Sequence, residues 1–166
     1  MNRLLLTMLL VLTALPARAA EVSGMFGQGR TQYSLGIGNA YAFDHSYFVI
    51  SVSAGYYVVD GLGVGLAFEN WSGAAPGITK YAPFAQYVFY QVPAVQPYVG
   101  GFYRHTNIAG LPGINSLGAR GGIFIAAGSN ASVGVGFIHE SYIDCQASIY
   151  RACSETYPDI SFALVF

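Results

Sequence analysis

Charged residues are scarce in this 166-residue chain. Asp, Glu, Lys and Arg together make up 9% of it, whereas a soluble domain has about 25%. The seven basic and eight acidic residues are spread thinly and give a formal net charge of −1, which excludes the basic patch of a nucleic-acid-binding protein. Because 54% of the residues are hydrophobic, something other than water must cover much of the surface.

Long hydrophobic runs are missing too, except at the amino terminus. There Arg3 precedes the apolar stretch Leu4 to Leu15, and Ala17-Arg18-Ala19 follows it as a small-x-small cleavage site, the pattern of a secretory signal peptide. The stretch is too short to cross about 30 Å of hydrocarbon. We therefore expect residues 1–19 to be a signal peptide, cleaved near Ala19, and residues 20–166 to form one domain.

In the mature part, Gly, Ser, Asn or a charged residue interrupts every apolar run before it reaches the length of about 18 residues that a spanning helix needs. Only helices and closed β-barrels satisfy all of their backbone hydrogen bonds in lipid. An apolar exported chain without long runs therefore predicts a barrel.

Cysteine is rare as well: the chain has two, Cys145 and Cys153. Two cysteines and three scattered histidines do not make a metal site, and the sequence has no nucleotide-binding loop or cofactor motif. We therefore expect neither a metal nor a cofactor. In an exported chain, the oxidising compartment favours a disulfide between two cysteines so close in sequence.

Alternation of apolar with small or polar residues is what the chain has in abundance. It recurs along the mature sequence in segments of about ten residues, separated by turn residues, as in a transmembrane β-barrel. Eight segments can be counted, an even number, as single-chain bacterial barrels require. They are residues 31–40, 47–59, 62–70, 79–90, 96–105, 116–127, 132–142 and 158–166. The predicted fold is all-β: an eight-stranded antiparallel up-and-down transmembrane β-barrel.

The predicted connections alternate in length. Asp60-Gly61, Gln91 to Val95 and Gly128 to Ala131 are short, whereas 41–46, 71–78, 106–115 and 143–157 are longer. Outer-membrane barrels have short periplasmic turns and longer extracellular loops. This pattern predicts that both termini lie in the periplasm.

The alternation also assigns each residue to a face of the wall. We expect lipid to contact the apolar sets, and the glycine, alanine and serine between them to point inward. The outward sets are Phe48, Ile50, Val52 and Ala54; Leu62, Val64, Leu66 and Phe68; and Ile160, Phe162, Leu164 and Phe166. Aromatic residues near strand ends are expected in the interfacial girdles: Tyr33, Trp71, Tyr87, Phe89, Tyr98 and Tyr103. The alternative, a soluble β-sandwich or lipocalin-like barrel, would need a larger apolar inner face.

The chain resembles the small eight-stranded outer-membrane proteins of Gram-negative bacteria. Its last residues, Ile160, Phe162, Leu164 and the terminal Phe166, are similar to the signal that the outer-membrane assembly machinery recognises. The resemblance implies a bacterial outer-membrane location and, as partners, that machinery, outer-membrane lipid and lipopolysaccharide. It leaves the activity open, because this architecture includes structural proteins, adhesins, narrow channels and lipid-modifying enzymes.

Six ionisable residues fall on the predicted inner face. They are Glu69, Lys80, Arg104, Arg120, Glu140 and Asp159. Three are acidic and three basic, and we expect all six near the extracellular ends of the strands, in a network whose mutual pairing removes most of the cost of burial. The network is either a salt-bridged plug or a selective constriction. The interior of an eight-stranded barrel is just wide enough for side chains to fill, which favours the plug, with Phe84, Phe102 and Phe124 as fillers below it.

His139 and Ser141 are the one pair that could perform chemistry. They lie two apart on the outward face of the penultimate segment. This His-x-Ser pair resembles that of the lipid A 3-O-deacylases, which would make Ser141 a nucleophile and His139 its general base. The family's following Asn-Ala-Gly is replaced here by Tyr142-Ile143-Asp144. Those deacylases also have a carboxylate on the last strand. Asp159 is expected to point inward, away from His139, unless a bulge near Pro158 reverses the alternation, and Glu155 could approach His139 only from the loop.

The longest predicted connection, 143–157, contains both cysteines. It is either a rigid extracellular knob that binds a ligand or a loop protected against proteolysis. The sequence as a whole favours a non-enzymatic outer-membrane barrel with a largely closed interior, whose extracellular loops serve membrane integrity or surface interaction. The alternatives are a lipid A deacylase that uses Ser141 and His139, and a narrow channel for small or apolar solutes.

Overall fold

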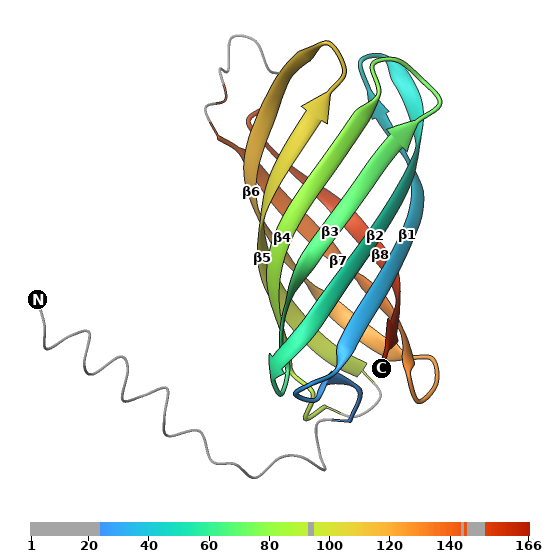
Figure 1. Ribbon diagram of the computed structural model, residues 1–166, viewed down its shortest axis with the longest axis vertical. Coiled ribbons are helices and arrows are strands. Elements are labelled where there is room, and N and C mark those ends of the chain that lie inside the picture. Colours follow the sequence, from blue (N-terminus) through green and yellow to red (C-terminus); the bar gives the residue numbers. More distant parts are fainter. Residues whose placement is uncertain (1–23, 93–94, 144, 146–151) are drawn as a thin grey trace, which may run out of the picture.

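Eight antiparallel strands close into a barrel in the computed structural model (Figure 1), which describes residues 24–92, 95–143, 145 and 152–166. The expected signal peptide lies outside these residues. A short 3₁₀ helix, η1 (Gly24–Phe26), precedes the first strand. The strands are β1 (Thr31–Ala42), β2 (His45–Val59), β3 (Leu62–Ser72), β4 (Ile78–Val88), β5 (Val95–Ile108), β6 (Leu111–Ala126), β7 (Ala131–Tyr142) and β8 (Ser154–Val165).

Each strand pairs with the next in sequence, and β1 also pairs with β8. The predicted fold class is thereby confirmed, and each predicted segment corresponds to one strand. Among the described residues, no helix is long and apolar enough to cross a membrane.

Two of the connections predicted to be long are tight turns. β1 and β2 meet at Phe43-Asp44, where both residues have positive φ (50° and 60°), the backbone of a hairpin turn that matches strand twist. β5 and β6 meet at Ala109-Gly110. The predicted loops 41–46 and 106–115 were wrong because the strands continue past the apolar segments on which the alternation was read. β8 likewise begins at Ser154, so the loop predicted as 143–157 ends at Cys153.

The barrel has two distinct ends. We call the end with the turns at 60–61 and 127–130 and with the carboxyl terminus the terminus end, and the opposite one the loop end (Figure 1). The longest connection joins β7 to β8, whose residues Tyr142 and Ser154 are at the loop end, and it contains the disulfide Cys145–Cys153, so the predicted disulfide is present.

The outer face carries a band of apolar side chains, as predicted for β2, β3 and β8. Toward the loop end the outward side chains become polar on almost every strand, where Asn39, Asn70, Thr79, His105, Asn115, His139 and Thr156 follow the last apolar residues. Two residues assigned to the aromatic girdles were placed wrongly: Tyr98 is buried inside the barrel, and Trp71 points inward beside Glu69. Inward residues are even-numbered on β5 and odd-numbered on β3, so the alternation itself places both side chains inside the barrel.

An aromatic cluster fills the interior at the terminus end. It consists of Phe26, Tyr57, Val88, Tyr98 and Phe124, and we call it the aromatic seal. The Tyr98 and Phe124 rings are stacked at 4.5 Å, and Phe26 reaches Phe124 at 5.4 Å. Phe26 and Phe124 are 2% and 0% exposed, so η1 closes this end of the barrel with an apolar side chain.

Candidate functional site: a charged layer inside the barrel

The six ionisable residues predicted on the inner face all point inward and form three ion pairs. Lys80 Nζ lies 3.3 Å from Glu69, Arg104 Nη1 lies 2.5 Å from Glu140, and Arg120 Nη2 lies 4.0 Å from Asp159. The pairs come from six different strands. Period-two alternation brings each residue to the interior, and strand register decides which of them meet.

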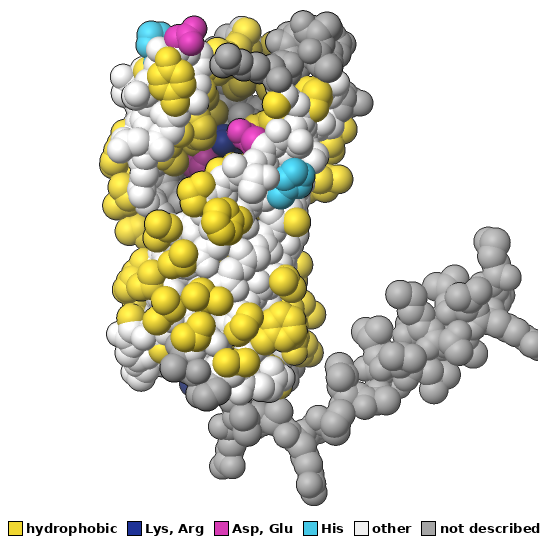
Figure 2. All heavy atoms as spheres, turned by 180° about the vertical axis from the view of Figure 1, so that it is seen from behind, with side chains coloured by type: hydrophobic (Ala, Val, Ile, Leu, Met, Phe, Trp, Pro, Cys, Tyr) yellow, Lys and Arg dark blue, Asp and Glu magenta, His cyan; other side chains and the backbone are white. Residues whose placement is uncertain are grey.

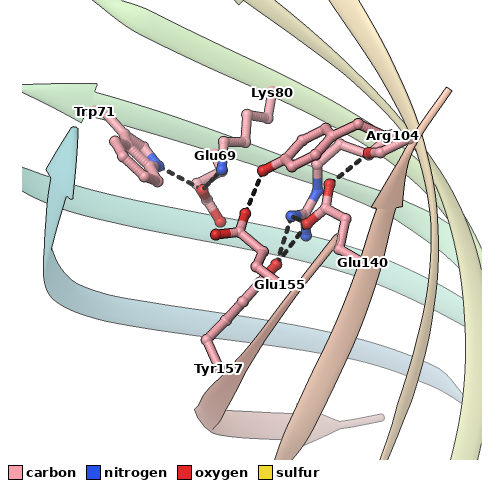
Figure 3. Close-up of polar contacts among 9 residues, drawn as sticks. Glu69, Trp71, Lys80, Arg104, Glu140, Glu155 and Tyr157 are labelled. Carbon is pink, nitrogen blue, oxygen red and sulfur yellow. Dashed lines mark hydrogen bonds and ion pairs between the residues drawn. The ribbon is translucent and has the colours of Figure 1, made fainter. Parts of the chain in front are cut away.

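Arg104 and Glu140 form the most buried of the pairs (Figure 3). Glu140 is 1% exposed, and its carboxylate accepts hydrogen bonds from Arg104, from the Ser116 hydroxyl and from the Tyr157 hydroxyl at 2.7 Å. Arg104 also donates to the Tyr157 oxygen at 2.7 Å. A buried charge is costly unless it is paired and hydrogen-bonded, and both conditions are met here by residues of β5, β6, β7 and β8.

Glu69 and Lys80 are direct cross-strand neighbours on β3 and β4. The Trp71 indole donates a hydrogen bond to Glu69, and Lys80 Nζ lies 4.1 Å from the centre of the Trp71 ring (Figure 3). The lysine therefore has both an ionic and a cation–π partner. Trp71 belongs to this group and not to the membrane interface.

The third pair lies closer to the terminus end than expected. Arg120 stands over the rings of Phe84 and Tyr98, at 5.7 and 5.2 Å, and the Tyr98 hydroxyl donates to Asp159 at 3.4 Å. Because Tyr98 belongs to the aromatic seal, this pair connects the seal to the charged layer. The expectation that all six charges lie near the extracellular ends was wrong for Arg120 and Asp159.

A fourth inward carboxylate, Glu155, falls within the connection predicted over 143–157. It lies on β8 opposite Glu140 and accepts a hydrogen bond from Tyr142. Among the described residues it has no ion-pair partner. With Glu155, the layer contains four acidic and three basic side chains.

Little space remains between the charged residues and the predicted fillers. Phe84, Phe102, Arg104 and Arg120 are among the residues that line a cavity of about 30 Å³, which is room for about one water molecule. Phe102 and Phe124 are buried, as the predicted filling role requires. The charged layer and the aromatic seal therefore obstruct the lumen at two successive levels.

Several tyrosine and serine residues of the layer were missed from the sequence. Ser116, Tyr142 and Tyr157 all have inward parity on their strands and hydrogen-bond the charged groups. Applying the alternation to hydroxyl side chains, and not to ionisable ones alone, would have found them.

His139 and Ser141 point outward, as predicted, but no described residue supplies the carboxylate that would be the third member of a catalytic triad. His139 Nδ1 is 2.8 Å from the Thr156 hydroxyl, its direct neighbour on β8. Asp159 and Glu155 lie on the opposite, inner face of that strand. No bulge interrupts the register of β7 with β8. Among the described residues, no carboxylate hydrogen-bonds His139.

A second histidine makes a similar contact. His105 Nδ1 on β5 lies 2.6 Å from the side-chain oxygen of Asn115, its neighbour on β6. Both histidines thus belong to the polar residues that follow the apolar band toward the loop end.

Comparisons with known proteins establish the fold. No protein-family profile matches the sequence, and no curated protein matches it. The N-terminal β-barrel domain of Pseudomonas aeruginosa OprF superposes with a TM-score of 0.67 at 15% identity, over 84% of this chain and 99% of that domain. Neisserial surface protein A superposes with a TM-score of 0.52 at 16% identity, over 82% of this chain and 94% of that protein. The shared feature is the small eight-stranded barrel predicted from the sequence.

Proposed function

We propose that the protein is a bacterial outer-membrane barrel that is closed to through-flow and presents its loop end to the cell exterior. The observation that carries the proposal is the two-level obstruction of the lumen, in which Phe26 and Phe124 are almost fully buried below the ion pairs. A channel would need a continuous polar path, and the aromatic seal interrupts it.

The outer surface supports the membrane location. Apolar side chains such as Leu66, Phe137 and Ile160 are 65–69% exposed, which is costly in water and favourable against lipid. The disulfide Cys145–Cys153, between the loop-end termini of β7 and β8, would then face the cell exterior, where the loop that it closes could bind a ligand or resist proteolysis.

Planar-bilayer recording tests closure. We expect no steady conductance from the wild-type barrel, with a bacterial porin as the positive control. Steady conductance that changes when Arg104 or Arg120 is replaced by glutamine would show an aqueous path through the charged layer and would contradict closure. Membrane fractionation and heat-modifiable gel mobility test the location separately, and a soluble periplasmic product would contradict it.

Lipid A hydrolysis is not favoured, because Thr156 stands where a carboxylate would have to orient His139. Mass spectrometry of lipid A from cells with the wild-type protein, the Ser141→Ala variant or neither should give identical acylation. Loss of one hydroxyacyl chain that depends on Ser141 would establish the deacylase instead.

A further inference from the structure

The seam that closes the barrel is incomplete. β1 and β8 are twelve residues each, but their register pairs run only from Gln32↔Val165 to Leu35↔Phe162. The other neighbouring strands pair along most of their length; for example, β7 and β8 pair from Ala131↔Leu164 to Ser141↔Ser154. Toward the loop end, residues 36–42 of β1 and 154–161 of β8 therefore have no register partner across the seam. The two strands are still close where this stretch begins, since a Cβ on Gly36 would lie 3.8 Å from the carbonyl oxygen of Ile160.

The backbone groups at this gap can be identified from the hydrogen bonds beside it. Thr31 and Phe166 exchange both of their backbone bonds across the seam, whereas Val165 donates to Asn130 on the opposite side. Since the direction alternates along a strand, odd residues of β1 and even residues of β8 face the seam. Continuing the observed register would place Ile37 beside Ile160 and Asn39 beside Pro158.

Pro158 weakens closure at that point. Proline has no N–H and is found on the free edges of sheets. On β8, residue 158 is one whose backbone N–H would point toward β1, and proline has none. The carbonyl of Asn39 would therefore have no hydrogen-bond donor even in a fully closed seam. The gap thus has a local cause in the sequence. Its two edges have one more backbone hydrogen-bond acceptor than backbone donors.

The gap opens on the charged layer. Gly38 and Glu155, which have inward parity, are exposed at the seam. Figure 2 shows acidic and basic side-chain atoms inside a hollow in the loop-end half of the wall. In Figure 3 the Glu155 carboxylate extends into the same part of the lumen as that of Glu69.

The gap also reaches the apolar band. Ile37 and Ile160, on its two sides, point outward and are 66% and 69% exposed, while Asn39 and Thr156 follow toward the loop end. Unpaired strand edges are not tolerated against hydrocarbon unless they line water or bind a polar group. An occupant with an apolar tail and a polar head fits both environments.

The charges decide which head group fits. In two of the ion pairs the acid is more exposed than its partner: 22% against 12% for Glu69 and Lys80, and 21% against 16% for Asp159 and Arg120. Glu155 adds an exposed carboxylate without an ion-pair partner among the described residues. A primary ammonium group, which has three donors and no acceptor, complements these carboxylates and the free carbonyl oxygens of the edge.

We propose that the gap between β1 and β8 is a lateral binding site for a single-chain aliphatic amine from the adjoining leaflet. Its ammonium group donates to the Glu155 carboxylate and to the free carbonyl oxygens of the edge, and its tail lies along Ile37 and Ile160. This inference rests on the proposed membrane location. Each variant is therefore first required to show heat-modifiable folding, a test of the barrel that does not depend on the amine.

The single tryptophan provides the assay, because Trp71 lies in the charged layer. The probe is an alkylamine with a dansyl group at the end of its tail, added to the barrel in zwitterionic detergent micelles, and the signal is energy transfer from Trp71. We expect saturable transfer with the amine and none with the same probe after acetylation. Removing the charge-assisted hydrogen bond by Glu155→Gln should weaken binding about tenfold. Asp44→Asn, the same charge change at the β1–β2 turn, should leave it unchanged.

A disulfide cross-link between β1 and β8 provides a second test of the binding site. A disulfide in Ile37→Cys/Ile160→Cys, or in Asn39→Cys/Pro158→Cys if the first variant does not fold, should abolish transfer. Reductant should restore it, with reductant-treated wild type as the control. Undiminished transfer in a cross-linked barrel, equal transfer from the acetylated probe, or displacement of the amine only by an extended peptide would overturn the proposal. A folded, membrane-inserted barrel that gives these results would leave the proposed function intact.

Discussion

The Arg104–Glu140 pair allows a quantitative test of the charged layer. Glu140→Gln is nearly isosteric and keeps a hydrogen-bonding group beside Ser116 and Tyr157, but it leaves Arg104 as a buried charge without its counterion. Arg104→Met keeps most of the arginine stem and leaves Glu140, 1% exposed, in the same state. Removing one partner of a buried ion pair costs about 3–5 kcal/mol. We expect each single variant to lose about that much of the free energy of unfolding.

The double variant Arg104→Met/Glu140→Gln removes both charges and should therefore lose less than the sum of the single variants. Replacing a whole buried pair by neutral groups is often close to neutral, so we expect a loss of about 1–2 kcal/mol. The coupling energy between the two residues is then several kcal/mol, above the range of about 0.5–3 kcal/mol usual for contacting residues.

Urea titration of the barrel in detergent micelles measures these values, with Trp71 fluorescence and heat-modifiable mobility as two independent signals. Asp44→Asn, in an exposed turn, is the control and should change stability by less than about 0.5 kcal/mol. Single-variant losses below about 1 kcal/mol, as at an exposed ion pair, would refute the reasoning. So would a double-variant loss equal to the sum of the single losses.

The other predictions use the same titration. Phe26→Ala should cost about 3–5 kcal/mol, because it empties the centre of the aromatic seal; a loss below about 1 kcal/mol would show that η1 does not seal the barrel. Gly122→Ala should lower the free energy of unfolding by about 1–3 kcal/mol, since its Cβ would lie 2.2 Å from the carbonyl oxygen of Val135. Gly38→Ala, whose Cβ would have nothing within 4 Å, should be close to neutral. Equal losses from the two variants would contradict this packing. Reducing Cys145–Cys153 should cost about 2–3 kcal/mol through the short loop that it closes, with Cys145→Ser/Cys153→Ser insensitive to reductant; a larger loss together with loss of heat-modifiable mobility would mean that the loop holds the barrel together.

Much of the fold and part of the candidate site could be predicted from the sequence. Period-two alternation is a local property of the chain, so it identified the eight strands, their outward faces and the six inward charges. The same local property made the strand ends uncertain. Past the apolar band, outward residues such as His105 and Asn115 are polar, and the alternation on which the prediction relied disappears although the hydrogen-bonded hairpin continues.

Which inward side chains meet is decided by the tertiary structure alone. Arg104 and Glu140 belong to β5 and β7, which are not neighbours, and only the curvature and register of the closed barrel bring them to 2.5 Å. The incomplete seam has the same origin. Pro158 and the sequence parity of β8 could indicate a weak edge, but only closure of the barrel places that edge beside residues 36–42 and opens it on the charged layer. Residues far apart in the sequence meet here through long-range register, which local alternation does not specify.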